Sequence, residues 1–175
     1  MVPDQLKDFP ALERVSVQWG DMDAFQRINN AMYIKYFESA RITHFYQLGL
    51  AAHNAGDSVE SGGSFDFKGF MHAKGVGPIL ASTSCTFKAA SKYPDDLIVG
   101  SKIDEADLGE DRFVMQYRVY SKTLDRVLAD GDGVIVMFDY EMNKKGRVSE
   151  ELRRAILAVD ARGPEFGFGD MSSIL

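Results

Sequence analysis

Hydrophobic and polar residues alternate with a period of two in several stretches of the chain, which is the pattern of β-strands half buried in a sheet. In the first stretch, Val15, Val17 and Trp19 alternate with polar residues. The five predicted strands span residues 12–19, 78–89, 97–103, 113–120 and 127–140. Polar turn sequences separate the last four strands, which favours an antiparallel meander. Two glycines, Gly131 and Gly133, interrupt the last strand and predict a bulge or bend there.

A different periodicity, typical of a helix, runs from Ala31 to about Leu50. The apolar stripe has spacings of four, three, four and four residues and consists of Tyr33, Phe37, Ala40, His44 and Leu48. Further apolar residues flank this stripe, so we expect a helix of about 30 Å that other elements cover on most sides. Asn29-Asn30 supplies a favoured N-cap, and Gly49 and the region of Gly56 are expected to end the helix.

The remaining segments predict a long loop and a short terminal helix. Residues 57–77 are rich in glycine, serine and charge and predict a loop with a short element near residues 65–70. Ser149-Glu150-Glu151 is typical of a helix start, and the residues after Gly163, about 163–175, are expected to form a frayed, flexible tail.

These elements predict an α+β fold in which one long central helix packs against an antiparallel sheet of about five strands. The whole chain, 1–175, is expected to form one domain whose core spans about residues 12–155. Because a single sheet of this kind leaves edges to be covered, we also expect a homo-oligomer, either a dimer or a tetramer.

Composition limits the classes of function. The 175 residues contain 45% hydrophobic and 26% charged residues, which is typical of a globular protein. The net charge of −6 argues against nucleic acid as a partner. One cysteine, Cys85, excludes an intrachain disulfide, and the absence of a long apolar run or a secretory signal predicts a cytoplasmic protein without a membrane span.

The segment before the long helix carries the most informative chemistry. Asp23 lies in a polar loop seven residues before the expected helix start at Asn30. The free amides of a helix N-terminus can stabilise an oxyanion, and a nearby carboxylate can activate water or attack a carbonyl. Together these are the parts for acyl transfer, although on spacing alone a turn or cap role for Asp23 is the more common one.

The order of residues in this segment resembles the signature of hotdog-fold acyl-CoA thioesterases of the 4-hydroxybenzoyl-CoA thioesterase type. That signature reads Asp-x-x-Gly-His-Val-Asn-Asn-x-x-Tyr, with a Glu and an Arg further along the helix. The matching residues here are Asp23, Ile28, Asn29, Asn30, Tyr33, Glu38 and Arg41. Weaker similarities follow around Gly77-Pro78, Tyr93-Pro94, Asp139 and Glu151, so the resemblance covers roughly residues 12–155.

The resemblance implies a hotdog fold and hydrolysis of an acyl-CoA or acyl carrier protein thioester to the free acid and thiol. It also implies that Asp23 is the general base or nucleophile, and that the backbone amide of Asn30 is the oxyanion donor. Arg27, Asn29 and Tyr33 are then substrate-binding candidates. No metal or separate cofactor is expected, since coenzyme A is part of the substrate.

The chain departs from the signature where the Gly-His pair becomes Gln26-Arg27. Gln26 is expected to reshape the loop, while Arg27 can pair with Asp23 or contact a phosphate. The phosphates of coenzyme A require local positive charge, for which Lys88 and Lys92 are the candidates, with Lys74, Arg118 and Lys122 as further possibilities.

Other reactive residue types have simpler interpretations. His44 is expected in the core or at an interface, and Cys85 as a small buried hydrophobic residue. The run Asp130–Gly133 lacks the ligands of a calcium loop, and the three histidines are too scattered for a zinc site. Two alternatives stay open, namely a non-catalytic acyl-CoA or lipid-binding hotdog protein and, behind it, a dehydratase, which normally needs a histidine beside its carboxylate.

Overall fold

The computed structural model describes residues 1–167 and 172, and its central element is the long helix α1 (Asn30–Asn54). The Asn29 side chain accepts a hydrogen bond from the Ala31 amide, so the N-terminus begins where the sequence predicted. The C-terminus lies four residues beyond the predicted one and is followed by Gly56 with a positive φ of 78°. Gly49 does not end the helix, contrary to the prediction. It lies within α1, where a Cβ would come within 2.6 Å of the Phe67 ring.

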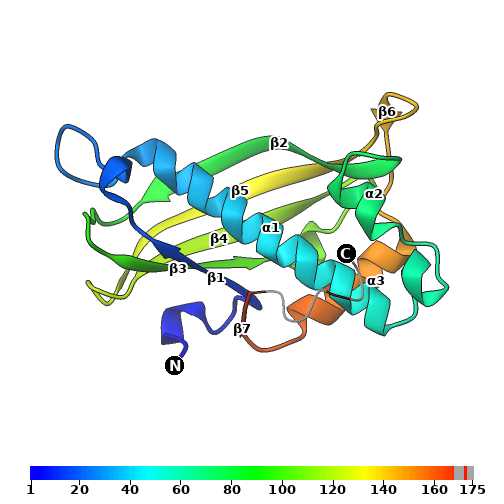
Figure 1. The fold of residues 1–175 in the computed structure, drawn as a ribbon, viewed down its shortest axis with the longest axis horizontal. Helices are drawn as coiled ribbons and strands as arrows, with labels where there is room; N and C mark the ends of the chain where they lie inside the picture. Colours follow the sequence, from blue (N-terminus) through cyan, green and yellow to red (C-terminus); the bar gives the residue numbers. More distant parts are fainter. Residues whose placement is uncertain (168–171, 173–175) are drawn as a thin grey trace.

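The strands form one seven-stranded sheet in the order β2-β5-β4-β3-β1-β7, with β6 paired to β5 (Figure 1). The strands are β1 (Ala11–Ser16), β2 (Val76–Phe87), β3 (Asp96–Lys102), β4 (Arg112–Ser121), β5 (Arg126–Asp139), β6 (Lys144–Lys145) and β7 (Glu165–Phe166). Five of these are the strands that the sequence predicted. The predicted antiparallel meander is confirmed for β3-β4-β5 but is wrong for β2, which pairs with β5 and not with β3. The other two have only two residues each, too short for a periodic pattern.

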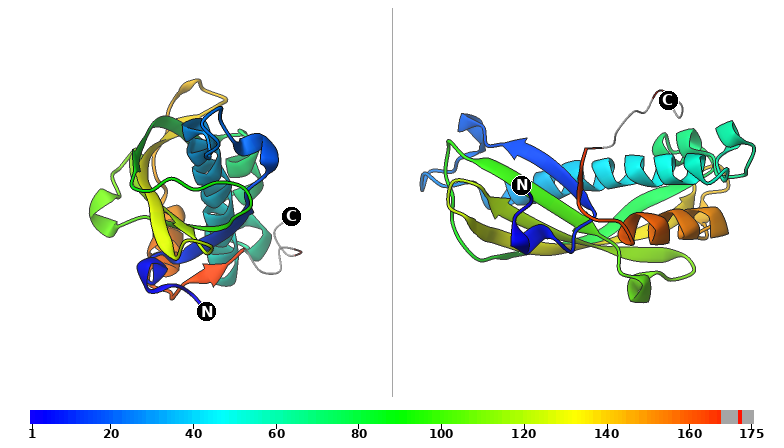
Figure 2. Two further views of the ribbon diagram at one scale, coloured as in Figure 1. Left: turned by 90° about the vertical axis from the view of Figure 1, so that its left-hand side faces the viewer. Right: turned by 90° about the horizontal axis from the view of Figure 1, so that it is seen from below.

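The sheet curves around α1, so that the helix lies on its concave face (Figure 2). Phe37 stacks on Tyr117 of β4 with ring centroids 4.8 Å apart. Gly131 of β5 makes room for this contact, because a Cβ there would lie 2.5 Å from the Phe37 ring. Strand pairing is continuous through Gly131 and Gly133, so of the predicted bulge or bend the bulge is wrong. The register instead shifts between Leu80 and Ser82 and between Val119 and Tyr120.

Two further helices close one end of the molecule. Helix α2 (Phe67–Met71) is the short element expected in the long loop, and α3 (Glu150–Asp160) begins at the Ser149 cap and lies beside α1 (Figures 1 and 2). The expected fraying after Gly163 is wrong for Glu165–Phe166, because β7 pairs in parallel with β1. The rest of that predicted tail, 168–171 and 173–175, lies outside the described residues. None of the described helices is both long and apolar enough to cross a bilayer.

Candidate functional site

The loop between β1 and α1 is anchored by the buried carboxylate of Asp21. This carboxylate accepts hydrogen bonds from the Tyr36 hydroxyl at 2.8 Å and from the Gln18 amide at 2.9 Å. The Asp21 carbonyl also accepts the Asn29 amide at 2.9 Å, immediately before α1. Asp21 therefore fixes the loop to the first turns of the helix.

Asp23 lies at the start of a tight turn that ends at Arg27. The Asp23 amide donates to the Arg27 carbonyl at 2.8 Å, and the Gln26 amide donates to the Asp23 carbonyl at 3.0 Å. One carboxylate oxygen, Oδ1, accepts the Phe25 amide at 2.8 Å. Gln26 has a φ of 58°, in the left-handed region that glycine adopts without strain. The loop thus keeps a backbone suited to glycine although the residue is glutamine.

The second carboxylate oxygen of Asp23 faces the Arg27 guanidinium. The distance from Oδ2 to Arg27 Nε is 3.7 Å, and the Asp23 side chain is 20% exposed. The pairing that the sequence suggested is therefore present, at the long end of ion-pair distances. Arg27 also lies over the exposed Phe25 ring, 5.3 Å from its centroid, so this cation has two neighbours within the same turn.

At the start of α1, the Asn29 side chain is used to cap the Ala31 amide. The Asn30 amide comes one residue earlier, at a position that has no acceptor within the helix. Asn30 itself is exposed and lines a cavity of about 210 Å³. A helix amide of this kind is a suitable hydrogen-bond donor to a developing negative charge.

This first cavity brings together several of the predicted residues, and it is lined by Arg27, Ile28, Asn30, Tyr33, Phe87, Lys88, Ala89 and Ala90. The Tyr33 ring packs edge-on against Phe87 at 5.2 Å. Burial raises the pKa of Tyr33 to about 12, so its hydroxyl stays protonated at neutral pH. Asp23 and Asn29 do not line this cavity.

A second cavity of about 270 Å³ is also lined by Arg27 and includes Lys92, Tyr93 and Leu124. Arg27 and Ala90 line both cavities. The predicted cations Arg27 and Lys92 are therefore close to one another, next to the loop that carries Asp23.

Lys88 is already engaged within the chain. Its Nζ forms an ion pair with Asp130, and Arg118 binds the same carboxylate at 2.7 Å and 3.1 Å. Burial alone would raise the pKa of Asp130, but the hydrogen bonds from Arg118 and Lys88 lower it below its ordinary value. Asp130 thus belongs to an ion-pair cluster.

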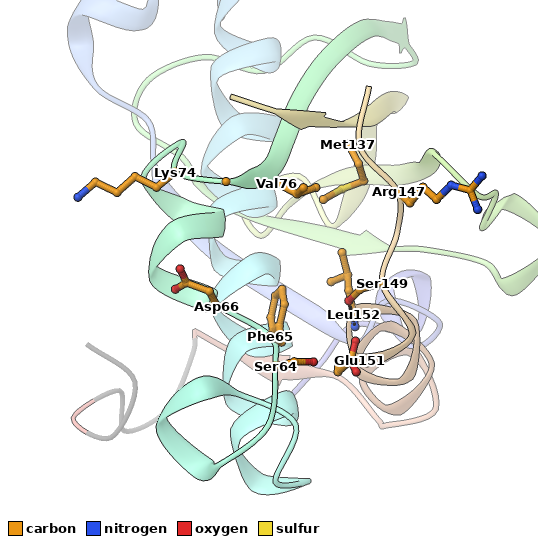
Figure 3. Close-up of a pocket in the computed structure, with 11 residues that line it drawn as sticks. Ser64, Phe65, Asp66, Lys74, Val76, Met137, Arg147, Ser149, Glu151 and Leu152 are labelled. Atoms are coloured by element: carbon orange, nitrogen blue, oxygen red, sulfur yellow. Dashed lines mark hydrogen bonds between the residues drawn. The ribbon is translucent and has the colours of Figure 1, made fainter. Parts of the chain in front are cut away.

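Lys74 does not line either cavity that contains the predicted cations Arg27, Lys88 and Lys92. It lines a separate cavity of about 250 Å³ formed with the start of β2 and the N-terminus of α3 (Figure 3). The Lys74 side chain points away from that cavity (Figure 3).

The remaining reactive groups have structural environments. His44 is fully buried, its Nδ1 lies 3.1 Å from the Ser101 hydroxyl, and burial lowers the pKa of its imidazole to about 3. Burial raises the pKa of the Cys85 thiol to about 11, which makes it a poor nucleophile. Within the described residues, no three His, Cys, Asp or Glu side chains are placed to hold a metal ion.

Two contributors were missed from the sequence. The first is Asp21, whose residue type is the same as that of Asp23 and therefore gave no sign of its different role as the anchor of the loop. Only its spacing to Tyr36, in the second turn of the helix, could have indicated this role. Phe87, 44% exposed on the outer strand β2, follows a stretch whose alternation is weak. Its position beside Tyr33 depends on how α1 crosses the sheet.

Comparison with known structures identifies the same arrangement of helix and sheet in other proteins. A thioesterase of Thermus thermophilus, crystallised with coenzyme A and zinc, is 24% identical, with a TM-score of 0.68 over 89% of this chain and 97% of that one. A 1,4-dihydroxy-2-naphthoyl-CoA thioesterase of Synechocystis is 16% identical, with a TM-score of 0.63 over 86% and 98%. These similarities establish the hotdog fold.

No curated protein sequence matches the chain. The sequence profile of the thioesterase-like superfamily, however, matches residues 17–156, from the end of β1 into α3. The matched region contains the Asp23 loop, all of α1 and the whole meander. This chain therefore belongs to the thioesterase-like superfamily.

Proposed function

We propose that the protein hydrolyses an acyl-CoA or acyl carrier protein thioester to a free acid and a thiol. The observation that carries the proposal is the placement of the partly exposed Asp23 carboxylate in a loop that is fixed to the N-terminus of α1. Arg27 connects the two, since it contacts Asp23 and lines the same cavity as Asn30. Superfamily membership supports the same class of reaction.

In this proposal the thioester carbonyl oxygen accepts a hydrogen bond from the Asn30 amide. As a general base, Asp23 takes a proton from water while the water oxygen attacks the carbonyl carbon, and the oxyanion forms at the amide. The carbon–sulfur bond then breaks, and the thiolate leaves and receives the proton. As a nucleophile, Asp23 would instead displace the thiolate to form a mixed anhydride, which water hydrolyses.

The thiol portion of the substrate is assigned to the second cavity. Arg27 and Lys92 supply positive charge there, and Tyr93 and Leu124 supply apolar surface. Phosphates pair well with guanidinium and ammonium groups. Lys88 contributes less in this assignment, because Asp130 already neutralises it. Asn29 contributes by capping α1, and Tyr33 contributes by forming part of the wall of the first cavity.

A homo-oligomer forms part of this proposal. Strand β2 is an outer strand of the sheet, and Val76, Ile79 and Phe87 on it are 40%, 36% and 44% exposed. Outer strands with exposed apolar side chains tend to pair with another chain. Light scattering after gel filtration would measure a mass of at least twice 19.5 kDa if this part is right, and 19.5 kDa if it is wrong.

The activity is tested by release of free thiol from a panel of acyl-CoA and aryl-CoA substrates, with one acyl carrier protein thioester included. The proposal expects turnover of at least one substrate. The alternative, a protein that binds acyl-CoA without hydrolysing it, is motivated by the Gln26-Arg27 departure. Tight binding in calorimetry with no thiol released over hours would select that alternative.

A further inference from the structure

Arg41 is a nearly buried cation in the middle of α1. Its side chain is only 11% exposed, and the one ion pair it makes among the described residues is with Glu38. That pair is long, at 3.9 Å, and Glu38 is 65% exposed. A buried charge is costly unless it is well paired, so this arrangement leaves the guanidinium weakly compensated.

Arg41 lines a cavity of about 210 Å³ whose other walls are almost entirely apolar. The cavity lies between α1 and the outer strand β2, and its walls include Ile42, Phe45, Phe70 and Leu80. The polar atom of Tyr140, which also lines it, already donates to the Pro78 carbonyl at 3.0 Å. The guanidinium is therefore the polar group of this pocket that is still available to a ligand. Many ligand sites likewise combine apolar walls with a few polar groups.

A second polar group, the Tyr117 hydroxyl, lies near Leu80 in the wall of this cavity. The Tyr117 hydroxyl is buried and makes no hydrogen bond of normal distance and angle among the described residues. Its place is fixed by the stack on Phe37 and by Gly133, where a Cβ would lie 3.0 Å from the hydroxyl and 3.3 Å from Leu80. Burial raises the pKa of Tyr117, and Arg41 offsets part of that rise through its charge and as a hydrogen-bond donor to the hydroxyl oxygen, which leaves the Tyr117 O–H free to donate.

The Arg41 cavity lies along the same side of α1 as the proposed oxyanion donor. Eleven residues separate Asn30 from Arg41, which is three helical turns, so the two share a face about 16 Å apart. Helix side chains lean towards the N-terminus, which brings the guanidinium roughly one turn closer. Strand β2 follows this face in the opposite direction, with Phe87 beside Tyr33 and Leu80 beside Arg41.

We propose that Arg41, assisted by the Tyr117 hydroxyl, binds a carboxylate at the far end of the acyl group, so that the preferred substrates are thioesters of medium-length dicarboxylic acids. Both groups donate hydrogen bonds. The planar guanidinium can bind both oxygens of a carboxylate or of a phosphate, and these are the anions that it fits best. The apolar walls suit the methylene chain between the thioester and the carboxylate. This inference rests on the proposed thioesterase function.

The test compares suberyl-CoA with octanoyl-CoA, which have chains of equal length and differ in the terminal carboxylate. For the wild type, kcat/KM should be at least tenfold higher for suberyl-CoA. Arg41→Met should lower the suberyl-CoA value by about 10- to 100-fold and leave the octanoyl-CoA value within a fewfold, since it removes a charge-assisted hydrogen bond and keeps an apolar stem. Tyr117→Phe should have a smaller effect in the same direction.

Lys35→Met is the matched control, because Lys35 is an exposed cation on the same helix and its loss should change neither value. Turnover of octanoyl-CoA shows that the thioesterase function holds. In that case the inference is overturned if Arg41→Met lowers kcat/KM equally for both substrates, or for neither. If the wild type hydrolyses neither of these two thioesters nor any other member of the panel, the proposed function fails instead. Calorimetry then decides the inference, which requires tenfold weaker binding of suberyl-CoA by Arg41→Met and is overturned by equal binding.

Discussion

The Tyr36 hydroxyl donates a 2.8 Å hydrogen bond to the buried carboxylate of Asp21, and this contact ties the loop that carries Asp23 to the second turn of α1. Burial raises the pKa of Tyr36 far above its ordinary value, and the hydrogen bond to Asp21 adds to the rise, so the hydroxyl is a permanent donor. The position of Asp23 thus depends on a residue that has no role in the proposed chemistry itself.

We expect Tyr36→Phe to lower the free energy of unfolding by about 1–3 kcal/mol, because it leaves a buried carboxylate with one partner fewer. It should also lower kcat, because the loop loses its tie to α1. Urea unfolding and thiol release measure the two effects. Tyr120→Phe is the control, since Tyr120 also donates to an aspartate, Asp125, but in a turn on another part of the sheet. If both variants lose stability and keep full activity, the Asp21 contact does not position the site.

The left-handed conformation of Gln26 gives a second prediction. Gln26→Gly should raise the free energy of unfolding by up to about 1 kcal/mol, since glycine adopts a φ of 58° without strain. Gln26→Val should lower it by more than that, because a β-branched residue fits this region poorly. Thermal unfolding of the pair checks the order. Equal melting temperatures for the two variants would mean that the loop does not hold this conformation in solution.

Asp160 at the end of α3 predicts a dependence of stability on pH. Its Oδ1 accepts the Ile103 amide at 3.1 Å, while its buried Oδ2 has no partner among the described residues. Burial raises the pKa of this carboxyl to about 7 from an ordinary 3.8. Between these values the native state holds a proton that the unfolded state releases, so this group makes the protein less stable as pH rises, by ~1.4 kcal/mol per unit.

Asp160→Asn should therefore gain stability relative to the wild type, and the gain should grow from pH 4.5 to pH 7 in urea unfolding. His44→Gln provides a control of opposite sign. Because the pKa of buried His44 is lowered to about 3 from 6.5, its contribution to stability is lost as pH falls below 6.5. The His44→Gln substitution should therefore lower the free energy of unfolding more at pH 6.5 than at pH 4.5. A difference between Asp160→Asn and the wild type that does not change with pH would contradict the assignment.

The sequence predicted the main elements of the fold because their signals are local. The period-two strands and the apolar stripe of α1 each depend on residues within one segment, as does the Asn29 cap. The errors arose where distant segments meet. Gly131 was interpreted as a bulge because the Phe37 ring that requires it lies 94 positions earlier in the chain, and Gly49 as a helix end although it makes room for Phe67.

The candidate site was predictable in part for the same reason. Asp23, Arg27 and Asn30 lie within eight residues of sequence, and the structure brings Arg27 and Asn30 to one cavity, with Tyr33 and Lys88. The pairing of Lys88 with Asp130 joins two different strands and has no local signal. The weak compensation of Arg41 also depends on tertiary packing, because the sequence alone shows an ordinary helix pair with Glu38.

The central claim is that the Asp23 carboxylate performs the chemistry, and the direct test is thiol release by wild type and Asp23→Asn on the best substrate of the panel. We predict that kcat falls by about 10²–10⁴ while the melting temperature changes little, because asparagine keeps the acceptor for the Phe25 amide but cannot take a proton or attack the carbonyl. An Asp23→Asn variant that is as fast as the wild type would contradict the account.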